Sequence, residues 1–274
     1  MGTESERKVR FEAYVGKLAA VVGHRDRHRP LREYCLGLLL PIERKSVEPL
    51  AAVIDPAHVS ARHQSLLHFV GQAPWNDAAA LRVVRQEVLP VMECHGTVEA
   101  WVLDDTGIPK KGKHSVGVKN QYCGVLGKNA NCQVAVSLSL ANQETSLPVG
   151  YRLYLPEEWA SDVARRRTAG VPDDVVFERK WQIALRLVDA QLAEGLAVPR
   201  APVLADAGYG DTVEFRDGLT ARGLAYAVGV SKTTSVWAPG TQPLPPKPYL
   251  GRGRPSTALR RTPEHTPVSA LDLA

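Results

Sequence analysis

Three aspartates stand where apolar, strand-like runs of the sequence end. Asp104 and Asp105 follow "WVL" in the segment "WVLDDTGIPKKGKHSVG", and Asp206 follows "VLA" in "APVLADAGYG". Carboxylates that are brought together repel one another in a medium of low dielectric constant unless a cation lies between them. Hard oxygen ligands favour Mg²⁺ or Mn²⁺, and two such ions about 3.5–4 Å apart activate a water or a hydroxyl for in-line phosphoryl transfer. If Asp104 and Asp206 meet, these residue types predict metal-dependent chemistry on phosphate esters.

Each of these acids also has a structural explanation. An aspartate at the end of a strand is often a turn former or a helix cap. Asp206 precedes the glycine-rich "AGYGD", and Asp211 at the end of that segment is suited to cap the helix that follows. Spacing alone therefore leaves the structural interpretation of the acids open.

A lysine-rich loop follows the first two acids, where a nucleic-acid backbone would have to approach a metal site. Phosphate contacts from lysine and arginine supply most of the affinity of a protein for DNA. We expect DNA-backbone contacts from the basic residues of this loop and of the strand after it: Lys110, Lys111, Lys113, His114 and Lys119.

Four further features have two explanations each. The cluster Arg165, Arg166 and Arg167 is either a DNA contact or a solvated helix end, and the basic segment from His24 to Glu33 has the same two explanations. Trp159 is either a core residue or a platform on which an unstacked base lies. The segment "GRGRP" contains Arg252 and Arg254, and either enters an A·T-rich minor groove or only connects strands.

Composition limits the function classes. The chain has 274 residues, a formal net charge of +5 and a pI near 9.0, which fits a polyanionic partner such as DNA without requiring one. Its four cysteines form no C-x-x-C pair, so free thiols in a reducing cytoplasm are expected and a zinc site is not. The charged start lacks a signal-peptide core, and no apolar run approaches ~18 residues. We expect a soluble, intracellular protein that is not associated with a membrane.

Hydrophobic periodicity predicts the elements that must position the acids. Residues 1–95 read as helical, with Asp77 as an N-cap. Beyond them the pattern changes to strands, with "KNAN" as a turn between the second and the third, and then to strands separated by helices. The expected order is strands over 98–105, 119–127, 131–142 and 146–156, a helix over 173–195 capped by Asp173 or Asp174, a strand ending at Asp206, a helix over 211–223 and a strand over 224–230.

This order predicts an α/β fold in which a mixed sheet has helices on its faces. Some of the later strands join the sheet through helical crossovers, so the strands that end in Asp104 and Asp206 can lie side by side. We expect three regions: an N-terminal helical region over 1–95, a catalytic domain over 96–238, and a Pro/Arg/Gly-rich segment over 239–274 that is an extended arm or the start of an insertion.

The motif blocks resemble those of a known family. "WVLDDTGIPKKGKHSVGVKNQYCGVLGKNANCQVAVSLSLAN", "LPVGYRLYLPEEW" and "VLADAGYGD" resemble the DDE-type transposases of bacterial insertion sequences, in the branch of the DDE superfamily endonucleases. The resemblance extends from about Leu66 to Pro267. It implies a ribonuclease-H-like fold, Mg²⁺ or Mn²⁺ as cofactor, and DNA cleavage at the ends of an element followed by joining to a target. The helical region is then expected to recognise terminal repeats or to form a homodimer. The resemblance also implies a protein of the bacterial cytoplasm that is associated with the nucleoid.

The resemblance also implies which acids act. Asp104 matches the first catalytic aspartate of the family's D-x-T pattern, and Asp206 matches the second. Asp105 lies between Asp104 and Thr106. Neighbours on a strand point to opposite faces, so only one of the pair should bind metal, and Asp105 is the alternate.

The third acid of the family, a glutamate on a later helix, has no match. Glu214 follows Asp206 too closely, and Glu264 lies in the proline-rich segment. We therefore expect a truncated or frameshifted transposase in which a lost metal ligand weakens catalysis. The alternatives are a catalytically inactive, DNA-binding or dominant-negative fragment, and a chain that does not fold stably alone.

Overall fold

The structure is a computed structural model that describes residues 3–193, 198–251, 254 and 256–274. By its internal contacts the chain divides into two compact units. One unit comprises Met1–Thr97 with Leu140–Gly150, and the other comprises Val98–Ser139 with Tyr151–Ala274. The functional division into regions 1–95, 96–238 and 239–274 stays a prediction.

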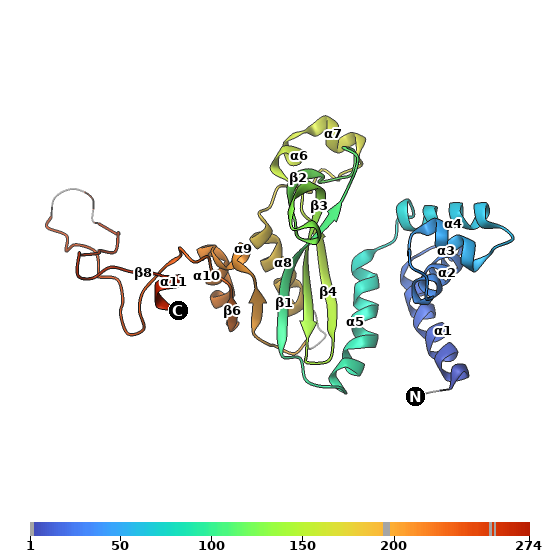
Figure 1. The fold of residues 1–274 in the computed structure, drawn as a ribbon, viewed down its shortest axis with the longest axis horizontal. Coiled ribbons are helices and arrows are strands. Elements are labelled where there is room, and N and C mark those ends of the chain that lie inside the picture. Colours follow the sequence, from blue (N-terminus) through green and yellow to red (C-terminus); the bar gives the residue numbers. More distant parts are fainter. Residues whose placement is uncertain (1–2, 194–197, 252–253, 255) are drawn as a thin grey trace. The chain divides into compact units, whose positions relative to one another are not determined.

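The N-terminal part of the first unit is helical, as its periodicity predicts. Apolar side chains from several of these helices form one core, which contains Val15, Leu18, Leu31 and Phe69. The helices are α1 (Glu4–Val21), α2 (His28–Leu39), α3 (Val47–Ile54), α4 (Val59–Gly71) and α5 (Asp77–Glu93), with a 3₁₀ turn, η1 (Arg25–Arg27), before α2 (Figure 1).

The N-cap of α5 is Asn76, and the prediction of Asp77 was wrong by one residue. The Asn76 side-chain oxygen accepts a hydrogen bond from the backbone N–H of Ala79 at 3.0 Å. Asn76 still has an extended backbone, whereas Asp77 is already helical. The side chain that caps a helix must stand just before its first turn, so only Asn76 can satisfy that free N–H group.

The second architectural element is a mixed sheet. Its strand order is β2-β3-β1-β5-β6, with β4 paired to β3. The pairs β1–β5 and β5–β6 are parallel, while β2–β3 is antiparallel. This order is that of a ribonuclease-H-like sheet, so the predicted fold class is confirmed. The strands are β1 (Ala100–Pro109), β2 (Lys119–Cys123), β3 (Lys128–Ala141), β4 (Ser146–Leu153), β5 (Val203–Ala205) and β6 (Tyr226–Val228).

The turn between β2 and β3 lies earlier than predicted. The expected strand over 119–127 ends at Cys123, and a 3₁₀ turn, η2 (Gly124–Leu126), follows it. Gly127 then reverses the chain with φ = 61°, a left-handed conformation that glycine adopts without steric cost. "KNAN" therefore begins β3 instead of forming the turn. The alternation within β3 is confirmed, because its buried face consists of Val134, Val136, Leu138 and Leu140.

Helices connect the later strands. Before β5 come α6 (Glu157–Ser161), α7 (Val163–Thr168) and α8 (Lys180–Ala193); after it come α9 (Ala207–Gly210) and α10 (Val213–Ala221). Figure 1 shows α6 and α7 at the end of the sheet where the β2–β3 hairpin lies. Helix α8 buries Ile183, Ala184, Leu185 and Val188.

Helix α8 begins later than predicted. Asp173 and Asp174 do not cap it, because the chain is still irregular at Arg179, whose backbone N–H donates to the side chain of Gln182 at 2.8 Å. The predicted end near Gly195 lies outside the described residues.

The C-terminal segment has local structure of its own. Strand β7 (Ser235–Val236) pairs in antiparallel fashion with β8 (Val268–Ser269), which leads into α11 (Ala270–Leu273). The rings of Trp237 and His265 lie 4.8 Å apart between their centroids. The chain after residue 239 is thus folded back on itself in part. In neither unit does a described helix have the length and apolar character needed to cross a bilayer.

Candidate active site

The register of two parallel strands brings Asp104 and Asp206 together. In the β1–β5 pair, Trp101 lies opposite Val203 and Val102 lies opposite Leu204. Continuing this register by two residues on each strand places Asp104 opposite Asp206. Because side chains alternate along a strand, Asp104 shares the face of Val102, and Asp206 shares the face of Leu204. Two residues that are 102 positions apart in the sequence thus point to the same side of one sheet edge.

Asp104 does not end its strand, contrary to the prediction. Strand β1 continues to Pro109 because β3 stays beside it after the pairing with β5 has stopped. The backbone N–H of Lys110 still donates to the carbonyl of Asn131 at 2.8 Å. The acid therefore sits at the point where β1 loses one neighbour, which opens a space beside it.

A cavity of about 420 Å³ occupies that space. Its lining includes Asp104, Asp105 and Asp206, whereas Glu214 and Glu264 are exposed and do not line it. The remaining lining residues come from β1, the β2–β3 hairpin and α8: Thr106, Gly107, Tyr122, Gly124, Val125, Val134 and Lys180. Asp104 and Asp206 thus share one cavity, and the alternate acid Asp105 shares it with them.

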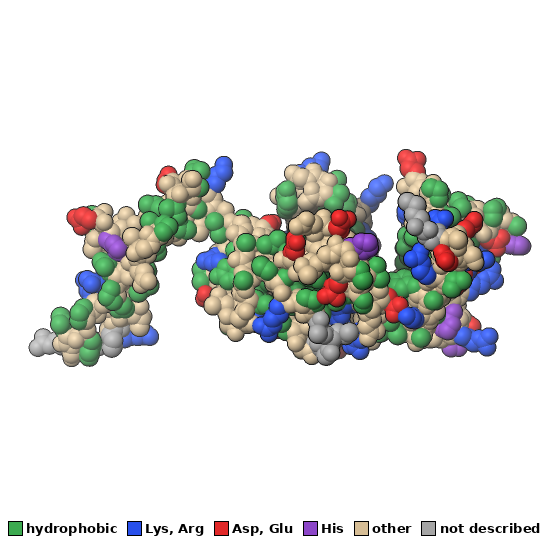
Figure 2. All heavy atoms as spheres, turned by 90° about the horizontal axis from the view of Figure 1, so that it is seen from below, with side chains coloured by type: hydrophobic (Ala, Val, Ile, Leu, Met, Phe, Trp, Pro, Cys, Tyr) green, Lys and Arg blue, Asp and Glu red, His purple; other side chains and the backbone are tan. Residues whose placement is uncertain are grey.

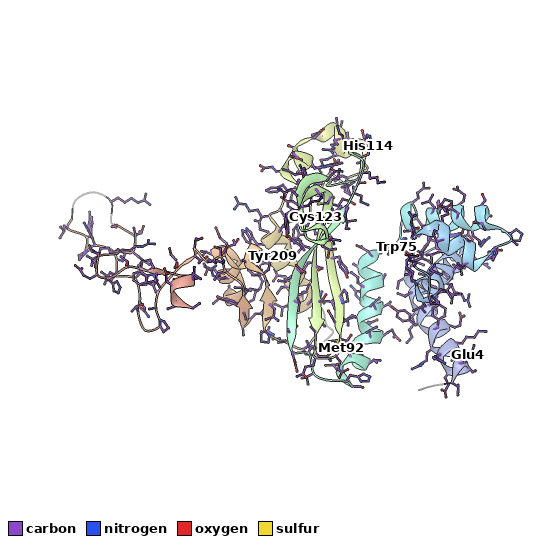
Figure 3. The ribbon with its side chains drawn as sticks, viewed as in Figure 1. Glu4, Trp75, Met92, His114, Cys123 and Tyr209 are labelled. Carbon is purple, nitrogen blue, oxygen red and sulfur yellow. The ribbon has the colours of Figure 1, made fainter. Side chains whose placement is uncertain are left out.

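Asp105 is held by two side chains that no sequence pattern singled out. The Lys180 ammonium, from the first turn of α8, lies 2.5 Å from Asp105 Oδ2. The Tyr209 hydroxyl donates a hydrogen bond to Asp105 Oδ1. Tyr209 belongs to the "AGYG" turn after Asp206, and Figure 3 labels it. The sequence offers one weak signal for this contact. Tyr209 stands three residues after Asp206, and its hydroxyl can form hydrogen bonds.

The hydroxyl of Tyr209 lies close to the negative charges of the cavity. Only 2% of its surface is exposed, and burial raises the pKa of its hydroxyl far above the ordinary value of 10.0. The charge of Asp105 and the hydrogen bond to it raise this pKa further, followed by the charges of Asp206 and Asp104. Three carboxylates thus act on one hydroxyl, which stays protonated and donates its hydrogen bond.

Asp104 and Asp206 differ from Asp105 in their partners. Asp104 Oδ1 accepts the backbone N–H of Asp105 at 2.7 Å, and Asp206 Oδ1 accepts that of Gly208 at 3.0 Å. Over the described part of the chain, no lysine, arginine or histidine forms an ion pair with either of them. Two exposed carboxylates on one face, each with an oxygen left over, suit a hard divalent cation. Among the described residues no group of three or more His, Cys, Asp or Glu side chains is arranged to hold a metal ion.

The lysine-rich loop after β1 is anchored at both ends. The Asn131 side chain donates to the carbonyls of Lys110 and Gly112 at 2.7 and 3.0 Å. The Arg165 guanidinium donates to the carbonyl of Lys113 at 2.8 Å, which connects α7 to the loop. Lys111, Lys113 and His114 are exposed, and Figure 3 labels His114 near α6 and α7. The predicted basic residues of the loop and of α7 are therefore neighbours.

Other predicted contact residues have partners within the chain. Arg166 donates to the backbone carbonyls of Ala160, Pro172, Asp173 and Val175, so its guanidinium holds together the loop after α7. Lys119 forms an exposed ion pair with Glu158 at 3.0 Å, which is weak enough to exchange for a phosphate. Arg167 is exposed.

Trp159 is a core residue, as the first of its two explanations has it. It is fully buried, and its indole N–H donates to the carbonyl of Val118 at 2.8 Å. The Arg165 guanidinium lies 3.6 Å from the centre of its ring. No face of this ring is free for a base.

Two further basic candidates belong to the segment "GRGRP". Arg254 is exposed, and Arg252 lies outside the described residues. On the face that Figure 2 shows, Lys and Arg side chains are scattered among apolar and acidic ones.

Comparison with known proteins identifies the family of the chain. The family model of the DDE superfamily endonucleases matches residues 17–274. A relative from Microchaete diplosiphon, described as a probable transposase for insertion sequence element IS701, is 30% identical over 178 residues. The match covers 65% of this chain and 42% of the relative, so the chain spans less than half of the relative's length. On the extent of the family match, the chain belongs to the DDE superfamily endonucleases.

Proposed function

We propose that the chain is a DNA transposase that cleaves DNA by metal-dependent phosphoryl transfer and joins the cut end to a target. The observation that carries this proposal is the convergence of Asp104 and Asp206, two residues past the paired positions of parallel strands, in one cavity. The family match and the transposase description of the relative support this reaction class.

In this proposal Asp104 and Asp206 hold Mg²⁺ or Mn²⁺. Their exposed oxygens on one face supply hard ligands, whereas Asp105 is neutralised by Lys180 and bonded to Tyr209. When bound, the divalent cation would lower the charge repulsion between a phosphate and the carboxylates and activate the attacking oxygen. The residues of the chain position this centre: Tyr209 and Lys180 fix Asp105, and Asp105 in turn presents its N–H to Asp104.

The basic loop is proposed to hold the DNA backbone. Lys110, Lys111, Lys113 and His114 directly follow the strand that carries Asp104, and Arg165 adds a further charge beside Lys113. Phosphate contacts of this kind orient the duplex without reading its sequence. DNA is therefore the proposed partner; a homodimer stays a prediction.

Nicking of supercoiled plasmid DNA in the presence of Mn²⁺ tests this function. We expect nicking by the wild-type chain, none after chelation with EDTA, and none by Asp104→Asn or Asp206→Asn. Asp217→Asn, an exposed acid on α10, is the matched control and should nick normally. Nicking that survives both Asp104→Asn and Asp206→Asn would contradict the proposal.

A second candidate function is DNA binding without cleavage. It is favoured by one observation: the third carboxylate of the cavity, Asp105, is already paired with Lys180 and so is not free to serve as another metal ligand. If the wild-type chain binds plasmid DNA but shows no Mn²⁺-dependent nicking, the second candidate is supported over the first.

A further inference from the structure

The cavity that contains the acids also has an apolar wall. Tyr122, Gly124 and Val125 line it together with Asp104 and Asp206. Tyr122 has 64% of its surface exposed, and Val125 has 72% exposed. An aromatic ring and an aliphatic side chain thus face solvent beside a group of carboxylates.

Close packing of the backbone puts this apolar wall beside the acids. A Cβ atom on Gly107 would lie 2.9 Å from Cys123 Sγ and 3.1 Å from Cys123 Cα, closer than side-chain atoms normally approach. Only glycine at this position of β1 lets the end of β2 cross so near. Cys123 is fully buried, and its neighbour Tyr122 therefore points away from the core. The two residues come from the hairpin near which Figure 3 labels Cys123.

Packing within the chain does not explain the exposed ring. Among the described residues, the Tyr122 ring has no aromatic or cation–π partner, and its hydroxyl has no hydrogen bond. Large aromatic side chains gain stability when they are covered, so an uncovered ring in a cavity wall is suited to a flat ligand. Stacking of a nucleic-acid base on an aromatic side chain contributes about 1–3 kcal/mol and does not depend on the base.

The size of the cavity selects the ligand. At about 420 Å³ it falls within the range of ~300–1,000 Å³ that is usual for small-molecule sites, and it has room for one nucleotide but not for a duplex. One wall is apolar and suits a base, and the other is acidic and suits a phosphate only through a divalent cation. We propose that the cavity binds a single unstacked nucleotide of the DNA substrate, with its base against Tyr122 and its phosphate toward Asp104 and Asp206.

This inference rests on the proposed function, because a phosphate does not approach the carboxylates without a cation. It makes Tyr122 a positioning residue that takes one nucleotide out of the base stack beside the bond to be cut. A nucleotide at a frayed or single-stranded end would enter most readily, because it has least stacking to lose.

Photo-crosslinking tests the contact directly. The probe is a short duplex with a single-stranded oligothymidine end that carries one 5-iododeoxyuridine, mixed with the whole chain and Ca²⁺. We expect a crosslink that mass spectrometry locates at Tyr122, and its loss in Tyr122→Ala. A crosslink that maps only to residues outside the cavity would overturn the inference.

Affinity for the same probe gives a second readout. Tyr122→Ala should weaken binding roughly 5- to 150-fold, the range that corresponds to the stacking free energy, while Tyr122→Phe and Tyr122→Trp should bind normally. Tyr226→Ala, a change at another exposed tyrosine of the same sheet, is the control and should have no effect. A fully paired duplex with closed ends should not distinguish Tyr122→Ala from wild type.

The outcomes separate the two proposals. If the wild-type chain nicks plasmid with Mn²⁺ but Tyr122→Ala binds the probe normally, the nucleotide site is wrong and the transposase proposal stands. If Tyr122 crosslinks and its loss weakens binding, yet no variant or condition produces nicking, the nucleotide site stands and the cleavage proposal fails.

Discussion

Asp104 and Asp206 stand two residues beyond Val102 and Leu204, which lie opposite each other in parallel strands β1 and β5. This equivalence, and not their distance in the sequence, places both carboxylates on one face of the sheet. It also separates Asp104 from Asp105, whose carboxylate is bonded to Lys180 and Tyr209. The two neighbouring acids should therefore respond differently to substitution.

Replacement of either proposed metal ligand should abolish nicking without unfolding the chain. Asp104→Asn and Asp206→Asn keep the size of the side chain at exposed positions, so thermal stability should change little. Loss of one ligand of a shared metal site should lower Mn²⁺-dependent nicking below the level that the assay detects, on the order of 100-fold or more. Plasmid nicking and thermal denaturation measure the two effects, and calorimetric titration with Mn²⁺ shows whether the metal affinity has fallen.

Replacement of Asp105 should affect stability more, and nicking less, than replacement of Asp104 or Asp206. Asp105→Ala removes the acceptor of the Tyr209 hydroxyl and the partner of Lys180, so the free energy of unfolding should fall by about 1–3 kcal/mol. Asp105→Asn keeps an acceptor for Tyr209 and should nick about 10-fold more slowly, the effect typical of a residue that supports a ligand. If Asp105→Asn is inactive while Asp104→Asn is active, the metal ligand on β1 is Asp105 and our assignment is wrong.

The buried Tyr209 hydroxyl should make the chain sensitive to alkaline pH. Its pKa in the folded state is raised above the ordinary value of 10.0, so the folded state holds this proton more tightly than the unfolded state. The stabilising contribution is therefore complete below pH 10 and is lost as the pH rises through the folded-state pKa. Urea denaturation at increasing pH should show a steeper loss of stability above about pH 10 in the wild type than in Tyr209→Phe. Equal slopes for the two proteins would exclude Tyr209 as the responsible group.

The basic loop should control how strongly DNA binding depends on salt. A variant with Lys111→Ala and Lys113→Ala should bind plasmid DNA more weakly, and the slope of log K against log salt should fall by about 0.9 for each phosphate that the variant no longer neutralises. Arg186→Ala, which removes a positive charge of α8 that is paired with Glu178, is the control. A slope that stays unchanged in the loop variant would place the DNA backbone elsewhere.

The sequence alone determined the class of fold and which side chains are available for chemistry. Local periodicity was enough for the helices up to residue 93 and for the buried face of β3, because burial on one side of an element is written into neighbouring residues. The three acids and the lysine-rich loop were also visible, since their residue types alone restrict the possible ligands. Where these predictions failed, as at the caps of α5 and α8, they failed by the position of an element's end.

Only the tertiary structure decided which of these residues have partners within the chain. The length of β1 beyond Asp104 depends on β3, the neutralisation of Asp105 depends on Lys180 of α8, and the burial of Trp159 depends on Val118. Each of these contacts joins residues that are far apart along the chain, and no local pattern encodes a partner at that distance. The sequence therefore specified which groups were present, while strand register and helix packing determined which of them stay free for a ligand.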